Sequence, residues 1–342
     1  MEKESNQKID IVLPWVDGSD SDWRRERAKW QGGSLSENAD DREERYRDYG
    51  LLRYWFRGIE ECMPWVRKIH FIHYGGRIPD WINTEHPKLD IVCHSDYIPS
   101  EYLPTFSSHV IELNLFRIKD LTENFIYFND DIFMLQKSVP EDWFRKGLPV
   151  DMLSFCPVLT DRLDEVMPYI RLNNSVVLTR HFDKKEVIHR LFFKLLHIGY
   201  PPLIFFYNLA EMVIPRFSAF LTWHDPSPLK KSYLKKIWEE EPEIMHSTSM
   251  HKFRDPRDVS QYLVREWIKL SGEFVPANVM RRAHFMYMTR LSDSDIKKIE
   301  KRRIKCVCIN DSYEGKDNDT AALAIKEALS KAFPHRSSFE LS

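Results

Sequence analysis

Short apolar runs alternate with amphipathic segments through the first half of the chain. Three runs, at residues 9–13, 68–73 and 89–93, have the length and apolar character of buried strands. A fourth run at residues 125–128 has the same character. Between the first two runs, apolar residues recur at helical spacing in residues 50–61. We therefore expect a helix between the first and second strands.

The pattern becomes more helical in the second half of the chain. A helix is expected at residues 107–117, before the fourth strand, and residues from 161 to about 249 have a mainly helical pattern. Residues 304–309 return as a strand-like run, and a last helix is expected at residues 320–331. Strands that alternate with helices are typical of a mainly parallel sheet covered by helices. The sequence thus predicts an α/β fold.

This order of elements predicts three parts. Residues 8–160 form an α/β core of the type that binds nucleotides, and residues 161–303 form a mainly helical subdomain inserted in it. Residues 304–342 return with a strand and a helix that complete the core. Because open parallel sheets bind ligands beyond the carboxyl ends of their strands, the polar residues at those ends are the first candidates for a site.

The charge balance excludes some classes of partner. The chain of 342 residues has 50 Lys and Arg against 52 Asp and Glu, a formal net charge of −2. A protein with this balance has no overall field that favours nucleic acid or an anionic membrane, so we expect no nucleic-acid partner. An anionic ligand would have to be held by local groups.

The cysteines and the N-terminus both indicate a reducing compartment. Five cysteines at scattered spacing are expected to be reduced thiols, and Cys306 and Cys308 are expected to pack in the core rather than to bind zinc. The first residues are charged and lack the apolar segment of a signal peptide, which favours a cytoplasmic location.

One segment, residues 200–223, is rich in Phe and Leu. Prolines and charged residues interrupt it, whereas a spanning helix needs roughly 20 mostly apolar residues. We therefore expect no transmembrane segment here, but buried helix and loop in the helical subdomain. Peripheral membrane contact, or a wall of an acceptor site, is the alternative.

Polar residues follow three predicted strands directly. Carboxylates and amides at these strand ends suggest one shared site. They are Asp17 and Asp20 after the first strand, Asn129, Asp130 and Asp131 after the fourth, and Asn310 and Asp311 after the late strand. Hard oxygen ligands of this kind suit Mg²⁺ or Mn²⁺ together with a diphosphate. Each motif alone is also an ordinary turn sequence, and it is their joint occurrence at strand ends that favours a site.

Other candidates lie in loops and at a helix start. Residues 103–108 lead into the helix that carries His109 and Glu112, so Thr and Ser hydroxyls could cap it while free amides face an anion. Arg53 and Arg57 are one helical turn apart, which suits either a phosphate clamp or, more commonly, an exposed face of ion pairs.

Two late loops add a titratable base and a guanidinium. His224, His251 and Arg254 lie between helical segments. Histidine accepts a proton near neutral pH, and arginine bridges phosphate oxygens. Any single histidine of the 13 in this chain is, however, more commonly structural or exposed than catalytic.

Taken together, these motifs resemble the Stealth family of sugar-phosphate transferases, which includes bacterial capsular polysaccharide phosphotransferases. Four blocks occur in the family's order, over residues 10 to 311. The first block is residues 15–20, and the second runs from residues 47–50 through residues 103–109 and Glu112 to residues 129–131. The third consists of His224 with residues 251–254, and the fourth is residues 308–311.

The resemblance implies a fold, a reaction and a setting. The expected fold is a nucleotide-sugar-binding sheet of the GT-A or Rossmann-like type. The expected reaction transfers a sugar 1-phosphate from a UDP-linked hexose or N-acetylhexosamine to a hydroxyl of a glycan acceptor, with release of UMP. The expected setting is the synthesis of capsular or other cell-surface polysaccharide from cytoplasmic donors, in the cytoplasm or at the inner face of the membrane.

The resemblance also implies roles for individual residues. Asp130, Asp131 and Asp311 would hold Mg²⁺ or Mn²⁺, Arg254 would neutralise the transferred phosphoryl group, and His224 would act as general base. Asp17 and Asp20 would shape the donor pocket, and Glu112 would orient a water or support the base. The remaining expected substrate contacts are Arg53, Ser107, Ser108, His109, Asn129, Asn310 and His251.

Two other functions fit the same residues. A metal-dependent glycosyltransferase of the GT-A type would use the same donor but would release UDP. A non-catalytic module that binds a nucleotide sugar or a glycan would keep the pocket without turnover.

Overall fold

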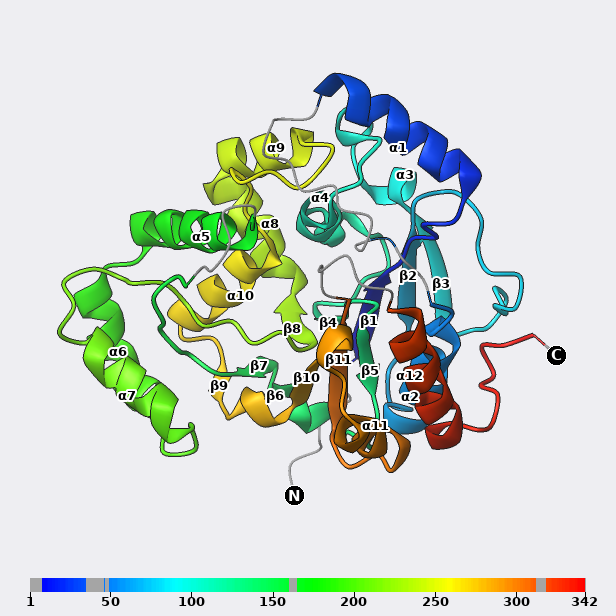
Figure 1. The fold of residues 1–342 in the computed structure, drawn as a ribbon. Coiled ribbons are helices and arrows are strands. Elements are labelled where there is room, and N and C mark those ends of the chain that lie inside the picture. The colour runs from blue at the N-terminus through cyan, green and yellow to red at the C-terminus, as the bar shows by residue number, and fades with distance from the viewer. Residues whose placement is uncertain (1–7, 35–45, 47–48, 160–164, 312–317, 342) are drawn as a thin grey trace.

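A five-stranded sheet in the order β3-β2-β1-β4-β8 forms the centre of the fold (Figure 1). The structure, a computed structural model, describes residues 8–34, 46, 49–159, 165–311 and 318–341. Four strands run parallel, and β8 is antiparallel to β4. The five strands of this sheet are β1 (Ile9–Pro14), β2 (Ile69–His73), β3 (Leu89–Cys93), β4 (Asn124–Tyr127) and β8 (Ser227–Lys230). The four parallel strands expected from the sequence are confirmed, and so is the α/β class.

Burial on both faces explains why the central strands are continuously apolar. Ile11 of β1 pairs with Ile69 of β2 on one side and with Ile126 of β4 on the other, and all three are buried. Helices cover both faces, so neither face requires alternating polar residues.

Asp10 is the charged exception in β1. It is fully buried and accepts hydrogen bonds from the Arg67 guanidinium at 2.6 and 2.7 Å and from the backbone N of Thr122 at 2.9 Å, with His70 Nε2 at 3.1 Å. Burial opposes ionisation, but the hydrogen bonds from His70, Arg67 and Thr122 outweigh it and lower the pKa of Asp10 to about 2. This buried ion pair joins β1 to β2 at the end of the sheet away from the candidate site.

Helix α2 (Leu52–Cys62) packs on one face of the sheet. Its apolar residues at Leu52, Trp55, Phe56 and Ile59 form one stripe, as the sequence predicts, and all are buried in the core that also contains Ile11. Helices α11 (Asp293–Glu300) and α12 (Asp319–Ala332) belong to the same side. The predicted last helix is thereby confirmed.

Gly58 lets α2 approach the following strand closely. A Cβ atom at this position would lie 2.6 Å from the carbonyl oxygen of Met134 in β5 (Ile132–Met134). Only glycine therefore fits between α2 and β5 at their present separation.

The opposite face of the sheet carries the short helices and the helical region. Val12, Phe125 and Tyr127 pack there against α4 (Ser108–Leu113) and α10 (Gln261–Leu270). The remaining helices of the chain's first third are α1 (Ser21–Ser34) and α3 (His94–Tyr97). Helix α1 forms in a highly charged stretch between the first strand and α2 for which the apolar pattern predicts no helix. Most of the residues between α1 and α2 lie outside the described residues.

Two small sheets flank the central one. The first has the order β10-β11-β5, in which β11 (Cys306–Asn310) runs parallel to β10 (Ala283–Tyr287) and antiparallel to β5. The second joins β6 (Phe144–Arg145), β7 (Leu148–Asp151) and β9 (Val275–Pro276). The expected late strand is thus present as β11, and its partners are β10 and β5 rather than the central strands.

The region from residue 165 to 250 is mainly helical, as predicted. Its helices lie on the left side of Figure 1, and none of the described helices has both the length and the apolar character needed to cross a bilayer. They are α5 (Met167–His181), α6 (Lys184–Leu195), α7 (Pro202–Glu211), α8 (Lys231–Glu240) and α9 (Pro242–Met250). Strand β8 lies inside this region and was not predicted, because Pro228 lacks the N–H of a central strand residue; β8 is an edge strand, where proline is tolerated.

The helix expected at residues 107–117 is shorter than predicted. Helix α4 ends at Leu113, because the Asn114 side chain donates to the carbonyl of Val110 and a 3₁₀ turn (Leu115–Arg117) follows. Other 3₁₀ turns are found at Ser100–Tyr102, Pro140–Asp142, Val279–Arg281 and Met288–Arg290.

Candidate active site

The candidate site lies where the strand order of the central sheet reverses. The chain proceeds from β1 to β2 and β3 on one side, and β4 then pairs with β1 on the other side. A crevice forms at such a reversal, beyond the carboxyl ends of the two strands. Asp17 and Asp20 follow β1, and Asn129, Asp130 and Asp131 follow β4. The topology therefore places both acidic motifs at one edge of the sheet, as the sequence predicted.

The turn after β4 is shared by two sheets. It links β4 directly to β5, and the backbone N of Ile132 donates to the carbonyl of Asn129 at 3.2 Å. The backbone N of Ile309 in β11 donates to the carbonyl of Asp131 at 2.9 Å. Contacts with both sheets thus fix the backbone of the acidic turn.

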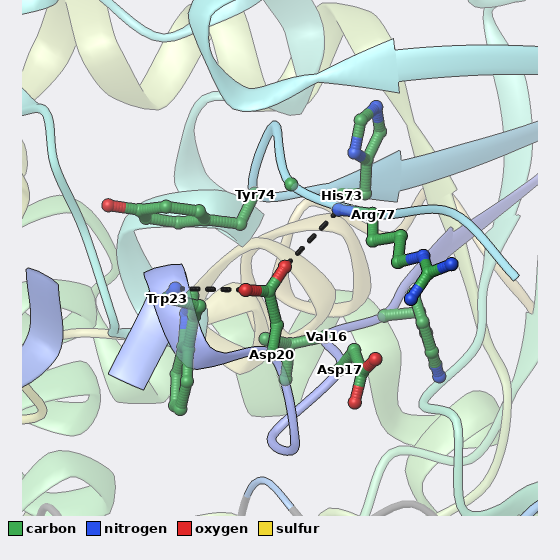
Figure 2. Close-up of a pocket in the computed structure, with 9 residues that line it drawn as sticks. Val16, Asp17, Asp20, Trp23, His73, Tyr74 and Arg77 are labelled. Atoms are coloured by element: carbon green, nitrogen blue, oxygen red, sulfur yellow. Dashed lines mark hydrogen bonds between the residues drawn. The ribbon is translucent and has the colours of Figure 1, made fainter. Parts of the chain in front are cut away.

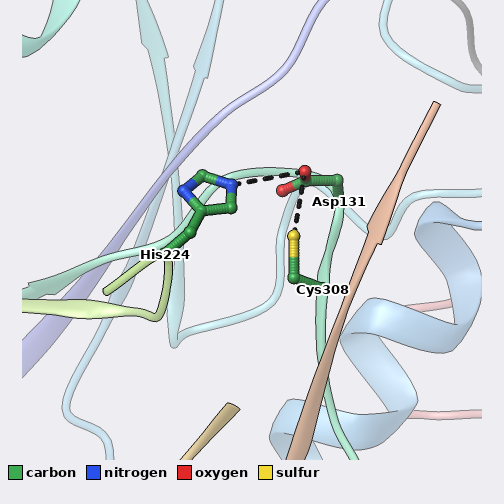
Figure 3. A group of neighbouring side chains, drawn as sticks. All are labelled: Asp131, His224 and Cys308. Atoms are coloured by element: carbon green, nitrogen blue, oxygen red, sulfur yellow. Dashed lines mark hydrogen bonds and ion pairs between the residues drawn. The ribbon is translucent and has the colours of Figure 1, made fainter. Parts of the chain in front are cut away.

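The side chain of Asp131 lies between a histidine and a cysteine (Figure 3). Its Oδ2 is 3.5 Å from Nε2 of His224 and 3.3 Å from Sγ of Cys308. Its Oδ1 is buried and has no hydrogen-bond partner among the residues that the structure describes. Such an orphaned carboxylate oxygen is costly unless a ligand satisfies it. Among the described residues, these three side chains form the group whose potential metal-ligand atoms lie within 4.8 Å of one another.

Both ring nitrogens of His224 have hydrogen-bond partners. Nδ1 is 3.0 Å from the Tyr262 hydroxyl in α10, and the Asn129 side-chain nitrogen is 3.4 Å from Nε2. Burial lowers the pKa of His224, but Tyr262, Cys308 and Asp131 together outweigh it and raise that pKa well above its usual value.

A buried ion-pair network fixes the loop that carries His224. The next residue, Asp225, is buried and lies 2.8 Å from the Arg265 guanidinium and 2.9 Å from that of Arg282. Arg265 also donates to Asp151 at 2.6 and 2.9 Å. Because these charges are paired inside the protein, the backbone beside His224 has little freedom to move.

Cys308 is buried in β11, as expected for a core cysteine, but it also belongs to this group. Burial, together with the nearby Asp131 carboxylate, raises the pKa of its thiol to about 12. The thiol is therefore protonated at neutral pH and donates its hydrogen to Asp131 Oδ2. The sequence expectation did not include this polar contact.

A second cluster lies at the start of α4. Arg254 donates from Nη2 to the Ser108 hydroxyl at 2.7 Å. Asp258 lies between two histidines, with Oδ2 2.9 Å from Nδ1 of His109 and Oδ1 2.6 Å from Nδ1 of His251. Burial raises the pKa of Asp258, but the two histidines overcome this and the net shift is downward. The structure thus brings together Arg254 and three expected substrate contacts, Ser108, His109 and His251.

The expected hydroxyl cap of α4 is absent. Ser107 occupies the N-cap position, yet its side chain makes no capping hydrogen bond, and within the described part of the chain its buried hydroxyl has no partner. Its backbone N instead donates to the Thr105 hydroxyl at 3.2 Å, which turns the chain before the helix begins. The prediction that Thr or Ser side chains cap the helix is therefore wrong for Ser107.

Glu112 connects the second cluster to the first. It accepts hydrogen bonds from the Tyr127 hydroxyl at the end of β4 and from the backbone N of Gln261, both at 3.2 Å. Gln261 precedes Tyr262, the partner of His224, on α10. The charges of Arg254 and Asp130 both act on Tyr127. Glu112 is thus a buried support between the two clusters.

A pocket opens beyond β1 and β2 (Figure 2). Its lining combines aromatic rings with carboxylates and a guanidinium; it consists of Trp15, Val16, Asp17, Asp20, Trp23, His73, Tyr74, Gly76 and Arg77. Asp20 caps α1, since its Oδ1 accepts from the backbone N of Asp22 at 2.8 Å and of Trp23 at 3.2 Å. Asp17 Oδ1 accepts from the backbone N of Ser19 at 2.8 Å.

Asp311 and Asn310 follow the late strand as expected, and the side chain of Asp311 has partners other than the Asp131 group. Asp311 accepts hydrogen bonds from the Tyr49 hydroxyl at 2.8 Å and from the Asn318 amide at 2.6 Å. Asn310 is the last residue of β11 and pairs with Tyr287. Asp311 therefore joins the start of α12 to the segment that precedes α2.

The two arginines of α2 face the C-terminal segment and a tryptophan. Arg57 forms a bidentate ion pair with Glu340 at 2.7 and 2.8 Å, which agrees with the ion-pair interpretation. The Arg53 guanidinium lies 5.0 Å from the ring centre of Trp81. Residues 47 and 48, which belong to the second sequence block, lie outside the described residues.

The sequence reasoning missed Cys308, Tyr262 and Asp225 as parts of the site. Cys308 alternates with Asn310 along β11, a spacing that places their side chains on one face of a strand and could have suggested it. Asp225 follows His224 directly, but nothing in the sequence indicates its partners Arg265 and Arg282. Tyr262 has a polar hydroxyl on an amphipathic helix, and no neighbouring sequence motif indicates that it contacts His224.

Three conserved regions described for Stealth proteins match this chain. Conserved region 1 matches residues 7–34, conserved region 2 matches residues 45–150, and conserved region 4 matches residues 297–342. The acidic turn after β4 lies in the second match and Cys308 in the third. His224 and Arg254 lie between these two matches.

Similar proteins extend over almost the whole chain. A capsular polysaccharide phosphotransferase WcwK of Streptococcus pneumoniae is 36% identical over 336 residues, which are 97% of this chain and 98% of the relative. The receptor polysaccharide phosphotransferase WefC of Streptococcus gordonii is 32% identical over 98% of this chain and 99% of its own. The exopolysaccharide phosphotransferase cps2G of Lactiplantibacillus plantarum is 30% identical over 97% and 96%.

Proposed function

This chain belongs to the Stealth family and is a phosphotransferase. From that premise we propose that it transfers a sugar 1-phosphate from a UDP-sugar to a hydroxyl of a glycan acceptor, with release of UMP. The proposed sugar is a hexose or an N-acetylhexosamine. The names of the similar proteins support a role in the synthesis of capsular or other extracellular polysaccharide. We propose that the reaction takes place in the cytoplasm, where nucleotide-sugar donors are made.

One observation carries this proposal. Asp131, at the strand-order reversal, lies 3.5 Å from His224, so an acid and a base from distant segments meet beyond β4. Phosphoryl transfer depends mainly on positioning and on neutralising charge, and this arrangement supplies groups for both.

The donor site is proposed to be of the GT-A or Rossmann-like type. The parallel order β3-β2-β1-β4 and the acidic motifs after β1 and β4 support this assignment. The pocket beyond β1 and β2 has aromatic side chains, including Tyr74, against which a uracil ring could stack. Asp17 and Asp20 would shape the ribose end of that pocket.

The residues at the acidic turn fit a divalent cation. Asp131 has a buried carboxylate oxygen without a partner, and Asp130 is exposed beside it, both hard oxygen ligands. Asp131 and Asp130 would hold Mg²⁺ or Mn²⁺, with Asp311 as a third acid once its contacts with Tyr49 and Asn318 rearrange. A cation bound there would neutralise charge on the diphosphate.

The transfer itself is an in-line substitution at the β-phosphorus. The acceptor oxygen forms a bond to this phosphorus, the bond to the oxygen that bridges the two phosphorus atoms breaks, and UMP leaves with that oxygen. The acceptor proton would pass to His224, which must be neutral to receive it. The raised pKa of His224 keeps it protonated at neutral pH, so the base role requires the positive charge of a cation bound beside it at Asp131, which would favour the neutral imidazole. Arg254, oriented by Ser108, would neutralise the transferred phosphoryl group.

The nucleotide product tests this proposal. The protein is incubated with a panel of UDP-sugars, with Mg²⁺ or Mn²⁺ and with glycan acceptors, and the nucleotides are separated by chromatography. UMP as the product supports transfer of a sugar 1-phosphate. UDP as the sole nucleotide product would show that the bond at the anomeric carbon is broken instead, as in a glycosyltransferase. Tight donor binding without turnover for every acceptor would indicate a binding module.

A further inference from the structure

The outer face of α6 and α7 is strongly apolar. These two helices lie at the left edge of Figure 1, on the side of the molecule opposite α2 and α12. Phe193 is 85% exposed, Ile198 95%, Phe206 64% and Val213 85%. Leu203 and Leu209 are exposed on the same pair of helices. Exposed large apolar side chains that gather on two neighbouring helices and the segments that follow them, rather than being scattered singly, mark an interaction site.

Polar contacts on the inner side hold the two helices in place. Lys184 of α6 donates to Glu211 of α7 at 2.6 Å and to the carbonyl of Ile214 at 2.7 Å. Asn208 of α7 donates to the carbonyls of Leu153 and Leu195 at 2.9 and 2.8 Å. Because the buried polar groups are satisfied on the inner side, the orientation of α6 and α7 is fixed, and the apolar side chains are directed outward by the fold.

The charges of this segment differ from those of the whole chain. Residues 183–216 contain five Lys and Arg and three Asp and Glu, a difference of 5 − 3 = +2, against −2 for the chain. Glu211 is already paired with Lys184 in the interior. Lys185 and Arg216 are exposed, as are Asp183 and Glu186, and Arg190 and Lys194 donate to backbone carbonyls at the end of α10. Apolar side chains bordered by a net positive charge suit an anionic bilayer surface.

This charge disfavours a second copy of the chain as the occupant. In a two-fold dimer the same surface meets itself, so the net positive charge of this segment would face a second net positive charge. An anionic lipid surface meets no such repulsion. No Asp, Glu, Lys or Arg occurs from Leu195 to Ala210, so this stretch could enter the interfacial region without burying a formal charge.

We propose that the outer face of α6 and α7 docks on an anionic lipid bilayer and inserts Phe193, Ile198, Phe206 and Val213 into its interfacial region. The chain then binds as a peripheral protein that lies on the membrane surface without spanning it. The proposal does not depend on the reaction that the protein catalyses.

Vesicle flotation with the full chain tests this. The vesicles are phosphatidylcholine alone or phosphatidylcholine mixed with phosphatidylglycerol. We expect the protein to float with the mixed vesicles and the double variant Phe193→Ser/Phe206→Ser to lose about tenfold or more of its binding. The matched control is Leu323→Ser, whose side chain is 61% exposed on α12, and it is expected to bind like the unaltered chain.

A charge variant separates the electrostatic contribution to membrane binding from the apolar one. Lys185→Glu/Arg216→Glu should weaken binding to the mixed vesicles and leave any binding to phosphatidylcholine unchanged. Circular dichroism and thermal unfolding confirm that each variant is folded. The proposal is overturned if the unaltered chain floats with neither vesicle, or if Leu323→Ser loses as much binding as the double variant. It is also overturned if sedimentation shows a dimer that the double variant dissociates, since the face would then be covered by a second copy.

Discussion

The thiol of Cys308 lies 3.3 Å from Oδ2 of Asp131, although the two residues are 177 positions apart in the chain. The contact occupies one carboxylate oxygen and leaves the other, Oδ1, buried and without a partner. Cys308 thereby orients the acid that is proposed to bind the cation, in the way that hydrogen bonds beyond the metal ligands tune many metal sites.

Replacing the thiol should therefore weaken the binding of the metal ion without unfolding the protein. We expect Cys308→Ala to raise the Mg²⁺ concentration needed for half-maximal activity by roughly tenfold. Cys308→Ser keeps a donor at this position and should stay closer to the unaltered enzyme. Activity is measured against Mg²⁺ concentration at saturating donor. An unchanged Mg²⁺ dependence in Cys308→Ala would mean that the contact does not orient Asp131.

The carboxylate of Asp131 itself should be indispensable. Asp131→Asn keeps the shape of the side chain and removes its charge, so we expect turnover to fall by about a hundredfold or more while thermal unfolding changes little. Asp120→Asn, at an exposed acid near the other end of the sheet, serves as the control. Near-normal turnover in Asp131→Asn would remove the residue from the proposed metal site.

Arg254 should require its planar guanidinium. Arg254→Lys keeps the charge but loses the fork of donors, and we expect kcat/KM to fall roughly tenfold to a hundredfold. Ser108→Ala removes only the hydroxyl that accepts from Nη2, and a loss of about 1 kcal/mol corresponds to roughly a fivefold decrease. Equal losses for the two variants would contradict the view that Ser108 acts through Arg254.

The buried Asp10 should make stability depend on pH in the acid range. Its pKa is about 2 in the folded chain against 3.8 for an ordinary aspartate, so the unfolded chain binds the proton more readily. The resulting contribution, about 2 kcal/mol, is complete above pH 3.8 and is lost as the pH falls through 2.

Comparison with Asp10→Asn isolates this contribution. The free energy of unfolding is measured in urea at pH 7 and at pH values below 3.8, for both proteins. We expect the variant to be less stable by about 3 kcal/mol at pH 7, because Arg67 loses its buried partner, and the difference to shrink in acid. A difference that stays constant with pH would show that Asp10 is not ionised in the folded protein.

Local sequence patterns predict the elements that are buried on both faces or carry one apolar stripe. The runs that became β1, β4 and β11, and the spacing of Trp55, Phe56 and Ile59 in α2, determine their structures almost alone. Strand β8 escaped prediction because Pro228 obscures a strand whose partner, β4, lies about a hundred residues earlier.

The residues of the candidate site also divide into those that local sequence patterns predict and those that they do not. The acids after β1 and β4 could be predicted, because a strand end and a carboxylate are both local features. The placement of Cys308, Tyr262 and Asp225 could not, because each depends on how distant elements pack. Ser107 shows the opposite error: a capping sequence was present, but the preceding Thr105 engages the backbone N of Ser107 and the cap does not form.

The close approach at Gly58 makes the acidic turn sensitive to a residue that never touches substrate. Helix α2 rests on β5 through this glycine, and β5 begins immediately after Asp131. An added methyl group would clash with the Met134 carbonyl and force α2 and β5 to shift relative to each other, which would disturb the turn that leads into β5. Gly58 therefore sets the distance between α2 and β5, and through β5 the alignment of Asp131 with His224. A substitution of Gly58 could reduce activity without unfolding the protein, although Gly58 does not line the pocket.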